Sequence, residues 1–121
     1  MNICVVGTGY VGLVTGAVFA DLGNDVVCVD NALAKIAQLQ AGQMPIYEPG
    51  LEEMVARNVA DGRLTFTADL AAGVRRSVIV FITVGTPAKD SGQTDLAAVE
   101  DVACGIAKAM ERHTVIVNKS T

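Results

Sequence analysis

A glycine-rich segment near the amino terminus carries the clearest chemical signal in this sequence. Gly7, Gly9 and Gly12 follow the spacing GxGxxG, directly after an apolar run at residues 3–6. In this pattern the first glycine permits a tight turn, the second lets the main chain approach a pyrophosphate, and the third allows close packing of a helix. The N-terminus of that helix offers unpaired amides and partial positive charge to the phosphates. The segment predicts a dinucleotide-binding turn; the alternative is a tight glycine turn without a ligand.

Asp30 supports the ligand-binding interpretation, because it ends the next apolar run about 20 residues after the glycine motif. A carboxylate there accepts hydrogen bonds from the ribose hydroxyls of adenosine and repels a 2′-phosphate. Neither of the next two residues, Asn31 and Ala32, is an arginine that could bind such a phosphate, so NAD is favoured over NADP. A helix-capping aspartate is the alternative. Lys35 could reach the ribose or phosphates of the cofactor, or could be an ordinary solvated lysine.

Two later segments could add polar groups, because each begins where an apolar run ends. They are residues 83–87, which close the run 78–83, and residues 119–121, which follow the run 114–117. Ligand clefts of doubly wound sheets open at the carboxyl ends of the strands. We expect hydroxyls and exposed amides of residues 83–87 to face the cofactor, although an ordinary strand-ending turn has the same composition.

Strands alternating with helices must position these groups. Strands are expected at residues 3–6, 26–29, 64–67, 78–83 and 114–117, and helices at 10–22, 32–40, 51–60 and 96–110. The last helix has inward-facing candidates at Leu96, Val99, Ala103, Ile106 and Met110. The strand runs are apolar rather than alternating, which is typical of a parallel sheet covered on both faces. The sequence therefore predicts an α/β fold, a doubly wound parallel sheet of the Rossmann type.

Composition narrows the class of protein. A length of 121 residues fits one domain, and the net charge of −4 with scattered Lys and Arg offers no stripe for nucleic acid. No apolar run approaches the roughly 18 residues of a membrane span, and no signal peptide is apparent, so a cytoplasmic location is expected. Cys4, Cys28 and Cys104 have no metal-ligand spacing and are interpreted as structural. No metal site is expected.

Over its whole length the chain resembles the amino-terminal part of the UDP-glucose 6-dehydrogenases, a family of nucleotide-sugar dehydrogenases. The resemblance lies in residues 7–16, Asp30 with Lys35, and residues 45–51, 62–67, 84–87, 94–96 and 119–121. Asn24 departs from the family, where many members carry histidine. The resemblance implies that residues 1–121 are an NAD-binding Rossmann domain and that the chain is a C-terminally truncated fragment of a longer enzyme.

The resemblance also implies an activity: oxidation of UDP-glucose to UDP-glucuronate with two NAD and water. It assigns NAD contacts to Gly7, Thr8, Gly9, Tyr10, Val11, Gly12, Asp30, Lys35, Val84, Gly85, Thr86 and Thr121. Thr121 would also position a catalytic water, while the nucleophilic cysteine would lie in a later segment and match none of the three cysteines here. The expected partners are a nucleotide sugar and further copies of the enzyme.

Two alternatives stay open at this point. The same domain could belong to a dehydrogenase of GDP-mannose or of a UDP-N-acetylhexosamine, because the residues that choose the sugar lie elsewhere. It could also be a module that binds NAD without performing hydride transfer.

Overall fold

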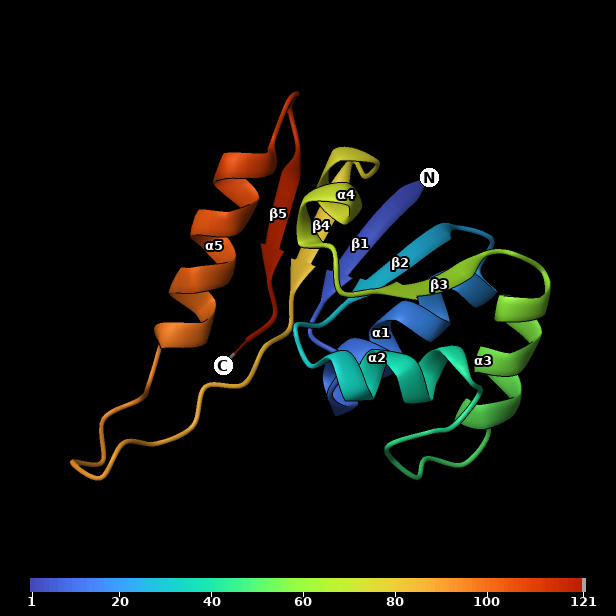
Figure 1. The fold of residues 1–121 in the computed structure, drawn as a ribbon, viewed down its shortest axis with the longest axis horizontal. Coiled ribbons are helices and arrows are strands. Elements are labelled where there is room, and N and C mark those ends of the chain that lie inside the picture. The colour runs from blue at the N-terminus through green and yellow to red at the C-terminus, as the bar shows by residue number, and fades with distance from the viewer. Residues whose placement is uncertain (121) are drawn as a thin grey trace.

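A fully parallel sheet of five strands organises the computed structural model, which describes residues 1–120 (Figure 1). The strands are β1 (Asn2–Val6), β2 (Asp25–Val29), β3 (Leu64–Thr67), β4 (Ile79–Ile82) and β5 (Val115–Asn118). The helices are α1 (Tyr10–Asp21), α2 (Leu33–Gln40), α3 (Leu51–Ala60), α4 (Leu70–Arg75) and α5 (Ala97–Ala109). The strand order β3-β2-β1-β4-β5 begins at the edge with β3 and reverses direction at β1. The predicted doubly wound sheet is confirmed.

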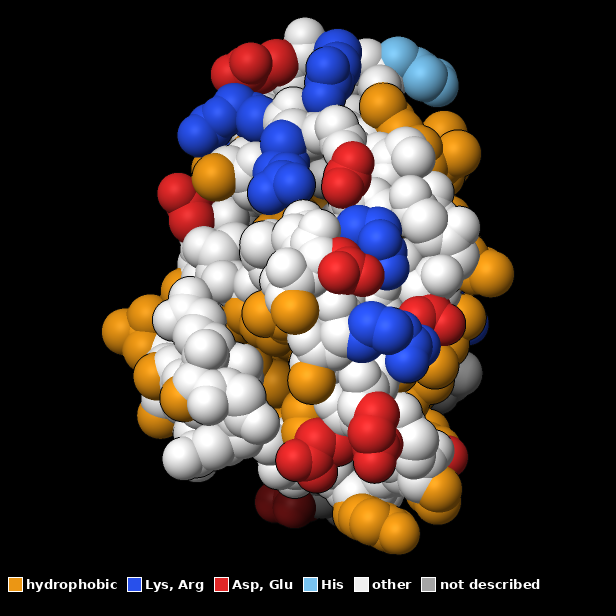
Figure 2. Space-filling view, turned by 90° about the vertical axis from the view of Figure 1, so that its right-hand side faces the viewer, with side chains coloured by type: hydrophobic (Ala, Val, Ile, Leu, Met, Phe, Trp, Pro, Cys, Tyr) orange, Lys and Arg blue, Asp and Glu red, His pale blue; other side chains and the backbone are white. Residues whose placement is uncertain are grey.

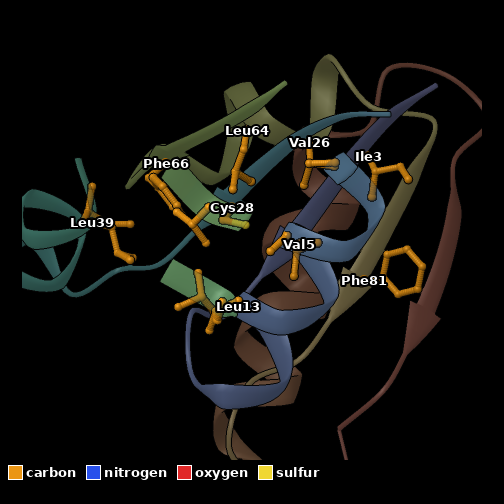
Figure 3. Close-up of a cluster of buried hydrophobic side chains, with 14 residues drawn as sticks. Ile3, Val5, Leu13, Val26, Cys28, Leu39, Leu64, Phe66 and Phe81 are labelled. Atoms are coloured by element: carbon orange, nitrogen blue, oxygen red, sulfur yellow. The ribbon is translucent and has the colours of Figure 1, made fainter. Parts of the chain in front are cut away.

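Side chains alternate along each strand between two apolar layers, one on each face of the sheet. In β1, Ile3 and Val5 join a cluster with residues of α1, α2 and α3 (Figure 3), whereas Cys4 and Val6 join a cluster with α4 and α5. Val5 and Cys4 are fully buried. Because both faces of the central strands β1, β2 and β4 are covered, nearly all of their residues are apolar, whereas the edge strands β3 and β5 expose part of their residues.

Small residues bring α1 against the sheet. A Cβ built on Gly16 would lie 2.6 Å from the Cys28 Sγ atom in β2, and Ala20 is fully buried. A larger side chain at either position would push the helix outward. This close contact fixes the start of α1, and with it the glycine turn, relative to the ends of β1 and β2.

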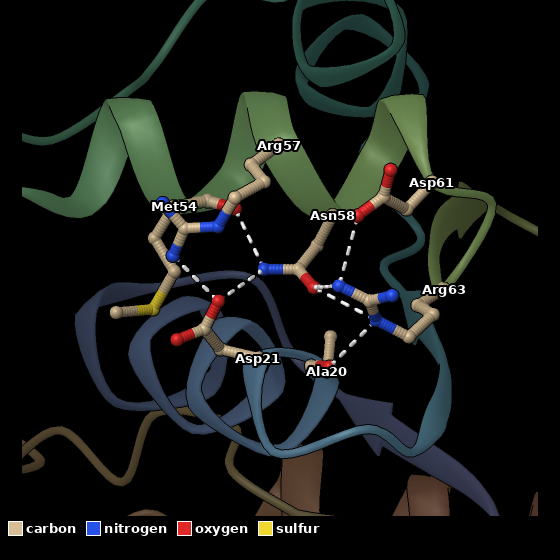
Figure 4. Close-up of polar contacts among 7 residues, drawn as sticks. All are labelled: Ala20, Asp21, Met54, Arg57, Asn58, Asp61 and Arg63. Carbon is tan, nitrogen blue, oxygen red and sulfur yellow. Dashed lines mark hydrogen bonds and ion pairs between the residues drawn. The ribbon is translucent and has the colours of Figure 1, made fainter.

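A polar cluster joins α1 to α3 and to the start of β3 (Figure 4). Asn58 is fully buried; its amide donates to Asp21 (3.1 Å) and its carbonyl oxygen accepts from Arg63 (2.9 and 3.1 Å). Arg63 also donates to the Ala20 carbonyl (3.1 Å) near the end of α1, and Arg57 donates to Asp21 (2.6 Å). The cluster thus provides hydrogen-bond partners both for the buried Asn58 amide and for a backbone carbonyl at the end of α1.

The sequence did not predict helix α4, and the predicted inward face of α5 was partly wrong. The helix α4 begins after Asp69, whose side chain accepts from the Ala72 amide, and Gly73 within it disguised the helical pattern. In α5 the predicted inward residues Leu96 and Ala103 are exposed; instead, Val102 and Ala109 are turned toward the core with Ile106. The helix α5 is therefore rotated about its own axis relative to the predicted orientation.

Charges of both signs are mixed on the face of the molecule that carries α3 and β3 (Figure 2). Figure 2 shows basic and acidic side chains next to one another there, with apolar groups between them. At the opposite edge of the sheet from β3, the edge strand β5 exposes Val115 and Ile116. Within residues 1–120, no helix has both the length and the apolar character that a membrane crossing requires.

Candidate dinucleotide-binding site

The glycine motif forms the turn between β1 and α1, and its three glycines meet different constraints. Gly7 has φ +107°, and a Cβ there would lie 2.8 Å from the Thr83 carbonyl oxygen. A Cβ on Gly12 would overlap the Gly7 carbonyl oxygen, whereas one on Gly9 would meet nothing within 4 Å. Gly7 and Gly12 are thus required by the fold. Gly9 instead faces open space, as expected where a ligand approaches the main chain.

The first turn of α1 presents amides without a side-chain cap. Gly9 is the N-cap residue, no side chain bonds to the turn, and no acidic residue stands in it. Leu13 is the first residue whose amide donates backward, to the Gly9 carbonyl (3.0 Å). The amides at the start of this 12-residue helix are therefore available to an anion, and the helix dipole stabilises negative charge there.

Asp30 is tied directly to the glycine turn. Its Oδ2 accepts from both the amide (3.0 Å) and the hydroxyl (2.7 Å) of the fully buried Thr8, and its Oδ1 accepts from the Ala32 amide (3.0 Å). Burial raises the pKa of Asp30, but these hydrogen bonds and the charge of Lys35 outweigh it, so the pKa is lowered overall. The carboxylate is ionised at neutral pH and held in one orientation.

The alternatives for Asp30 and Lys35 can now be compared with the geometry. The N-cap of α2 is Ala32, with no side-chain cap, and Asp30 bonds to that residue rather than to the first turn. Lys35 lies 3.9 Å from Asp30 and is about one-third exposed (35%). Asp30 is therefore not a helix cap in the ordinary sense, and Lys35 is neither fully solvated nor tightly paired.

A cleft of about 480 Å³ opens where these groups meet. Of the sequence-predicted residues, it is lined by Gly7, Thr8, Gly9, Asp30, Lys35, Val84 and Gly85. Gly12 lies beneath the turn, against Gly7 and Thr83, and is not part of the lining of this cleft. Residues from β1, β2 and the segment after β4 thus converge at the carboxyl edge of the sheet, as expected for a doubly wound fold.

A second, smaller cleft of about 300 Å³ continues past the glycine turn. The predicted residues that line it are Gly9, Tyr10, Val11, Val84, Gly85 and Thr86. Tyr10 and Val11 are about half exposed (53% and 46%), so they do not serve the core. The Tyr10 hydroxyl donates to Glu48 (2.9 Å), which ties the loop before α3 to the start of α1.

Thr83 differs from expectation. Its hydroxyl is directed to the Val6 (2.8 Å) and Gly7 (3.1 Å) carbonyls and so supports the glycine turn, while the residue itself lines both clefts. Ser120 plays a similar part at the rim, because its hydroxyl donates to the Val84 carbonyl (2.8 Å) and joins the end of β5 to the segment after β4. Thr121, the predicted water-positioning residue, lies outside the described residues.

The opposite wall of the larger cleft was not foreseen from the sequence. It consists of Ala68, Leu70, Ala98, Asp101 and Val102, at the starts of α4 and α5. Ala98, Asp101 and Val102 follow the i, i+3, i+4 spacing of one helix face, which was available in the sequence. Only the packing of α5 against the sheet indicates that this face lines the cleft.

Two of the cysteines have no role in this site. Burial raises the pKa of Cys4 to about 12 and raises that of Cys28 as well, so both thiols stay protonated. Cys104 is exposed on α5. Within residues 1–120 no group of His, Cys, Asp or Glu is arranged to hold a metal ion.

Comparison with known proteins agrees with this geometry. Residues 1–121 match the UDP-glucose/GDP-mannose dehydrogenase family, NAD binding domain. The UDP-glucose 6-dehydrogenase of Rhizobium meliloti (strain 1021) is 53% identical over 122 residues, and YwqF of Bacillus subtilis (strain 168), a UDP-glucose 6-dehydrogenase, is 49% identical over 121. Both alignments cover 100% of this chain, which spans 28% of the length of each relative.

Solved structures extend the comparison to other sugars. A GDP-mannose dehydrogenase from Pseudomonas aeruginosa matches with a TM-score of 0.95 at 40% identity, over 100% of this chain and 28% of its own. A UDP-D-ManNAc dehydrogenase from Pyrococcus horikoshii matches with a TM-score of 0.94 at 30% identity, with the same coverage. The shape of this domain is thus shared by dehydrogenases whose names give different sugars.

An NAD-binding domain needs three features to hold a dinucleotide, and this chain has them. They are the open space at Gly9, the uncapped start of α1 and the oriented carboxylate of Asp30. The chain belongs to the UDP-glucose/GDP-mannose dehydrogenase family, as its NAD-binding domain.

Proposed function

We propose that this chain is the NAD-binding part of a UDP-glucose 6-dehydrogenase, which oxidises UDP-glucose to UDP-glucuronate with two NAD and water. The observation that carries the proposal is the position of Asp30, fixed by Thr8 and Ala32 at the mouth of the cleft beside the glycine turn. Sequence identity of 53% to a UDP-glucose 6-dehydrogenase supports the choice of enzyme.

The residues of the chain have separate tasks in this proposal. The amides at the start of α1 bind the pyrophosphate, and the open face of Gly9 lets it approach. Asp30 accepts hydrogen bonds from the adenosine ribose hydroxyls, with Lys35 beside it. Tyr10, Val11 and Thr86 line the second cleft, where the nicotinamide half would extend.

NAD, when bound, supplies the hydride acceptor, and the chemistry at the sugar needs groups beyond this chain. The protonated, buried thiols of Cys4 and Cys28 are unsuited to nucleophilic attack. We therefore place the nucleophilic cysteine in a part of the longer enzyme outside residues 1–121, and we assign Thr121 to water positioning next to the cofactor. Assembly into homo-oligomers and a cytoplasmic location belong to the same proposal.

Titration calorimetry of the chain with NAD and NADP tests the cofactor assignment. Asp30→Asn removes the charge and one acceptor, so NAD affinity should fall by about 1–3 kcal/mol, since hydrogen bonds to charged groups contribute this much. The preference for NAD over NADP should shrink, because the repulsion of a 2′-phosphate is lost.

Asp25→Asn is the charge-matched control. Asp25 is exposed at the other end of β2, away from the cleft, so this variant should bind NAD as the unaltered chain does. Tighter binding of NADP than of NAD by the unaltered chain, or equal losses in the two variants, would contradict the proposal.

A GDP-mannose dehydrogenase is the second candidate, favoured by the TM-score of 0.95 to the Pseudomonas aeruginosa enzyme. The two candidates differ in the substrate that the longer protein oxidises. NADH formation with UDP-glucose and with GDP-mannose, followed by absorbance, separates them. Turnover of GDP-mannose alone would replace the first candidate by the second.

A further inference from the structure

The lining of the larger cleft comes from two chemically different groups of residues, and Asp30 is bonded toward both. Its carboxylate accepts from Thr8 in the glycine turn, and its amide donates to the Thr67 carbonyl (3.2 Å), at the end of β3 and just before α4. Gly7 and Gly9 belong to the first group, where α1 begins on one side of the sheet. The starts of α4 and α5 form the second group, and these helices pack against the opposite face. In an adenine nucleotide the phosphate and the base leave the ribose from different carbons. A ribose held at Asp30 with its phosphates at the glycine turn therefore directs its base toward α4 and α5.

The wall at α4 and α5 suits a flat base. Leu70 and Val102 supply apolar surface, and the Ala98 side chain is a single methyl group. Asp101 is the one charged residue that α4 and α5 contribute to the lining. None of the ion pairs within residues 1–120 involves it. A carboxylate in such a place accepts hydrogen bonds and donates none.

We propose that Asp101 selects the base of the cofactor, by accepting a hydrogen bond from the exocyclic amino group of adenine within the apolar pocket of Leu70, Ala98 and Val102. The inference rests on the proposed function, and it adds a specificity-determining residue to that site. A purine without the exocyclic amino group, with a hydrogen atom at that carbon, has no donor on this edge of the base. Such a base is disfavoured because the hydrogen bond to the carboxylate is lost.

The 6-unsubstituted purine analogue of NAD is the direct probe, because a hydrogen atom replaces the adenine amino group and the ring nitrogens keep their protonation. The unaltered chain should bind NAD about tenfold more tightly than this analogue, as expected for one hydrogen bond to a charged group. Asp101→Ala should bind the two dinucleotides with nearly equal affinity, through a loss of NAD affinity. Asp101→Asn should also reduce the ratio, because a neutral amide oxygen is a weaker acceptor than a carboxylate.

Glu100→Ala is the matched control, since Glu100 is exposed on the same helix and does not line the cleft. This variant should keep the tenfold ratio. Circular dichroism should show all variants folded, because alanine favours the helix and both side chains are exposed. An unchanged ratio in Asp101→Ala overturns the inference, and so does a preference of the unaltered chain for the unsubstituted purine form; in both cases NAD binding itself persists. Absence of NAD binding by the unaltered chain instead overturns the proposed function and this inference together.

Discussion

Replacing Gly9 or Gly12 by alanine should separate the demands of ligand binding from those of folding. Gly9 has φ −74° and ψ −165°, which any residue adopts, and a Cβ there meets nothing within 4 Å. Gly9→Ala should therefore change the free energy of unfolding by less than about 0.5 kcal/mol. Its methyl group would occupy the space proposed for the pyrophosphate. Affinity for NAD should fall by about 1.5–3 kcal/mol, the contribution of hydrogen bonds to a charged group.

Gly12→Ala should have the opposite balance. A Cβ at Gly12 overlaps the Gly7 carbonyl oxygen and also contacts Thr83. Backbone atoms cannot rotate away, so α1 or the turn must move, at the upper end of the roughly 1–3 kcal/mol typical of overpacking. The higher helix propensity of alanine returns about 1 kcal/mol. A net loss of about 2 kcal/mol is expected, or roughly 10 °C in Tm.

Urea unfolding followed by circular dichroism measures the stability of each variant, and calorimetry with NAD measures its affinity. The two variants are controls for each other, since both add one methyl group to the same turn. Unchanged NAD affinity in Gly9→Ala would refute the assignment of the open space to the pyrophosphate. Unchanged stability in Gly12→Ala would refute the close approach of α1 to the turn.

Three other predictions concern the rest of the fold. Asn58→Ala removes the amide that joins Asp21 to Arg63, so urea unfolding should reveal a loss of about 1–3 kcal/mol; a loss below about 0.5 kcal/mol would argue against the cluster. Hydrogen bonds from Arg57 and Asn58 lower the pKa of Asp21 below 3.8, so its stabilisation is present above that pH and is lost as the pH falls through the lowered value. Unfolding between about pH 5 and pH 2 should consequently be less pH-dependent in Asp21→Asn, and an identical profile would contradict this. The exposed edge strand β5 should drive self-association, which Ile116→Lys should reduce in sedimentation velocity; a strictly monomeric unaltered chain at high concentration would contradict it.

Local sequence patterns were sufficient for most elements of this fold. The strands are short apolar runs, and α1, α2 and α3 end just before Gly23, Gly42 and Gly62, so these elements follow from neighbouring residues alone. Helix α4 is the exception, because Gly73 weakens its helical pattern. The glycine there serves a tertiary contact: a Cβ would lie 2.9 Å from Val29 in β2.

The candidate site also has residues that the sequence predicted and residues that only the structure revealed. The glycine motif and Asp30 were recognisable because their spacing reflects one βαβ unit, whose geometry is set within about 30 residues of chain. Asp101 was not recognisable, because an exposed aspartate on a helix has no local signature. The hydroxyl of Thr83 was expected at the ligand and instead supports the turn, since its partner Val6 lies in the neighbouring strand.

The sequence by itself determined the α/β class, the glycine turn and the carboxylate for the ribose, because each depends on backbone preferences and spacing within a short stretch. The tertiary structure decided the order β3-β2-β1-β4-β5, the rotation of α5 and the far wall of the cleft. These depend on contacts between residues far apart in the sequence, such as Arg63 with Ala20 and Thr83 with Val6. Such contacts form only when side-chain volumes on both faces of the sheet fit together, and no local pattern encodes that fit.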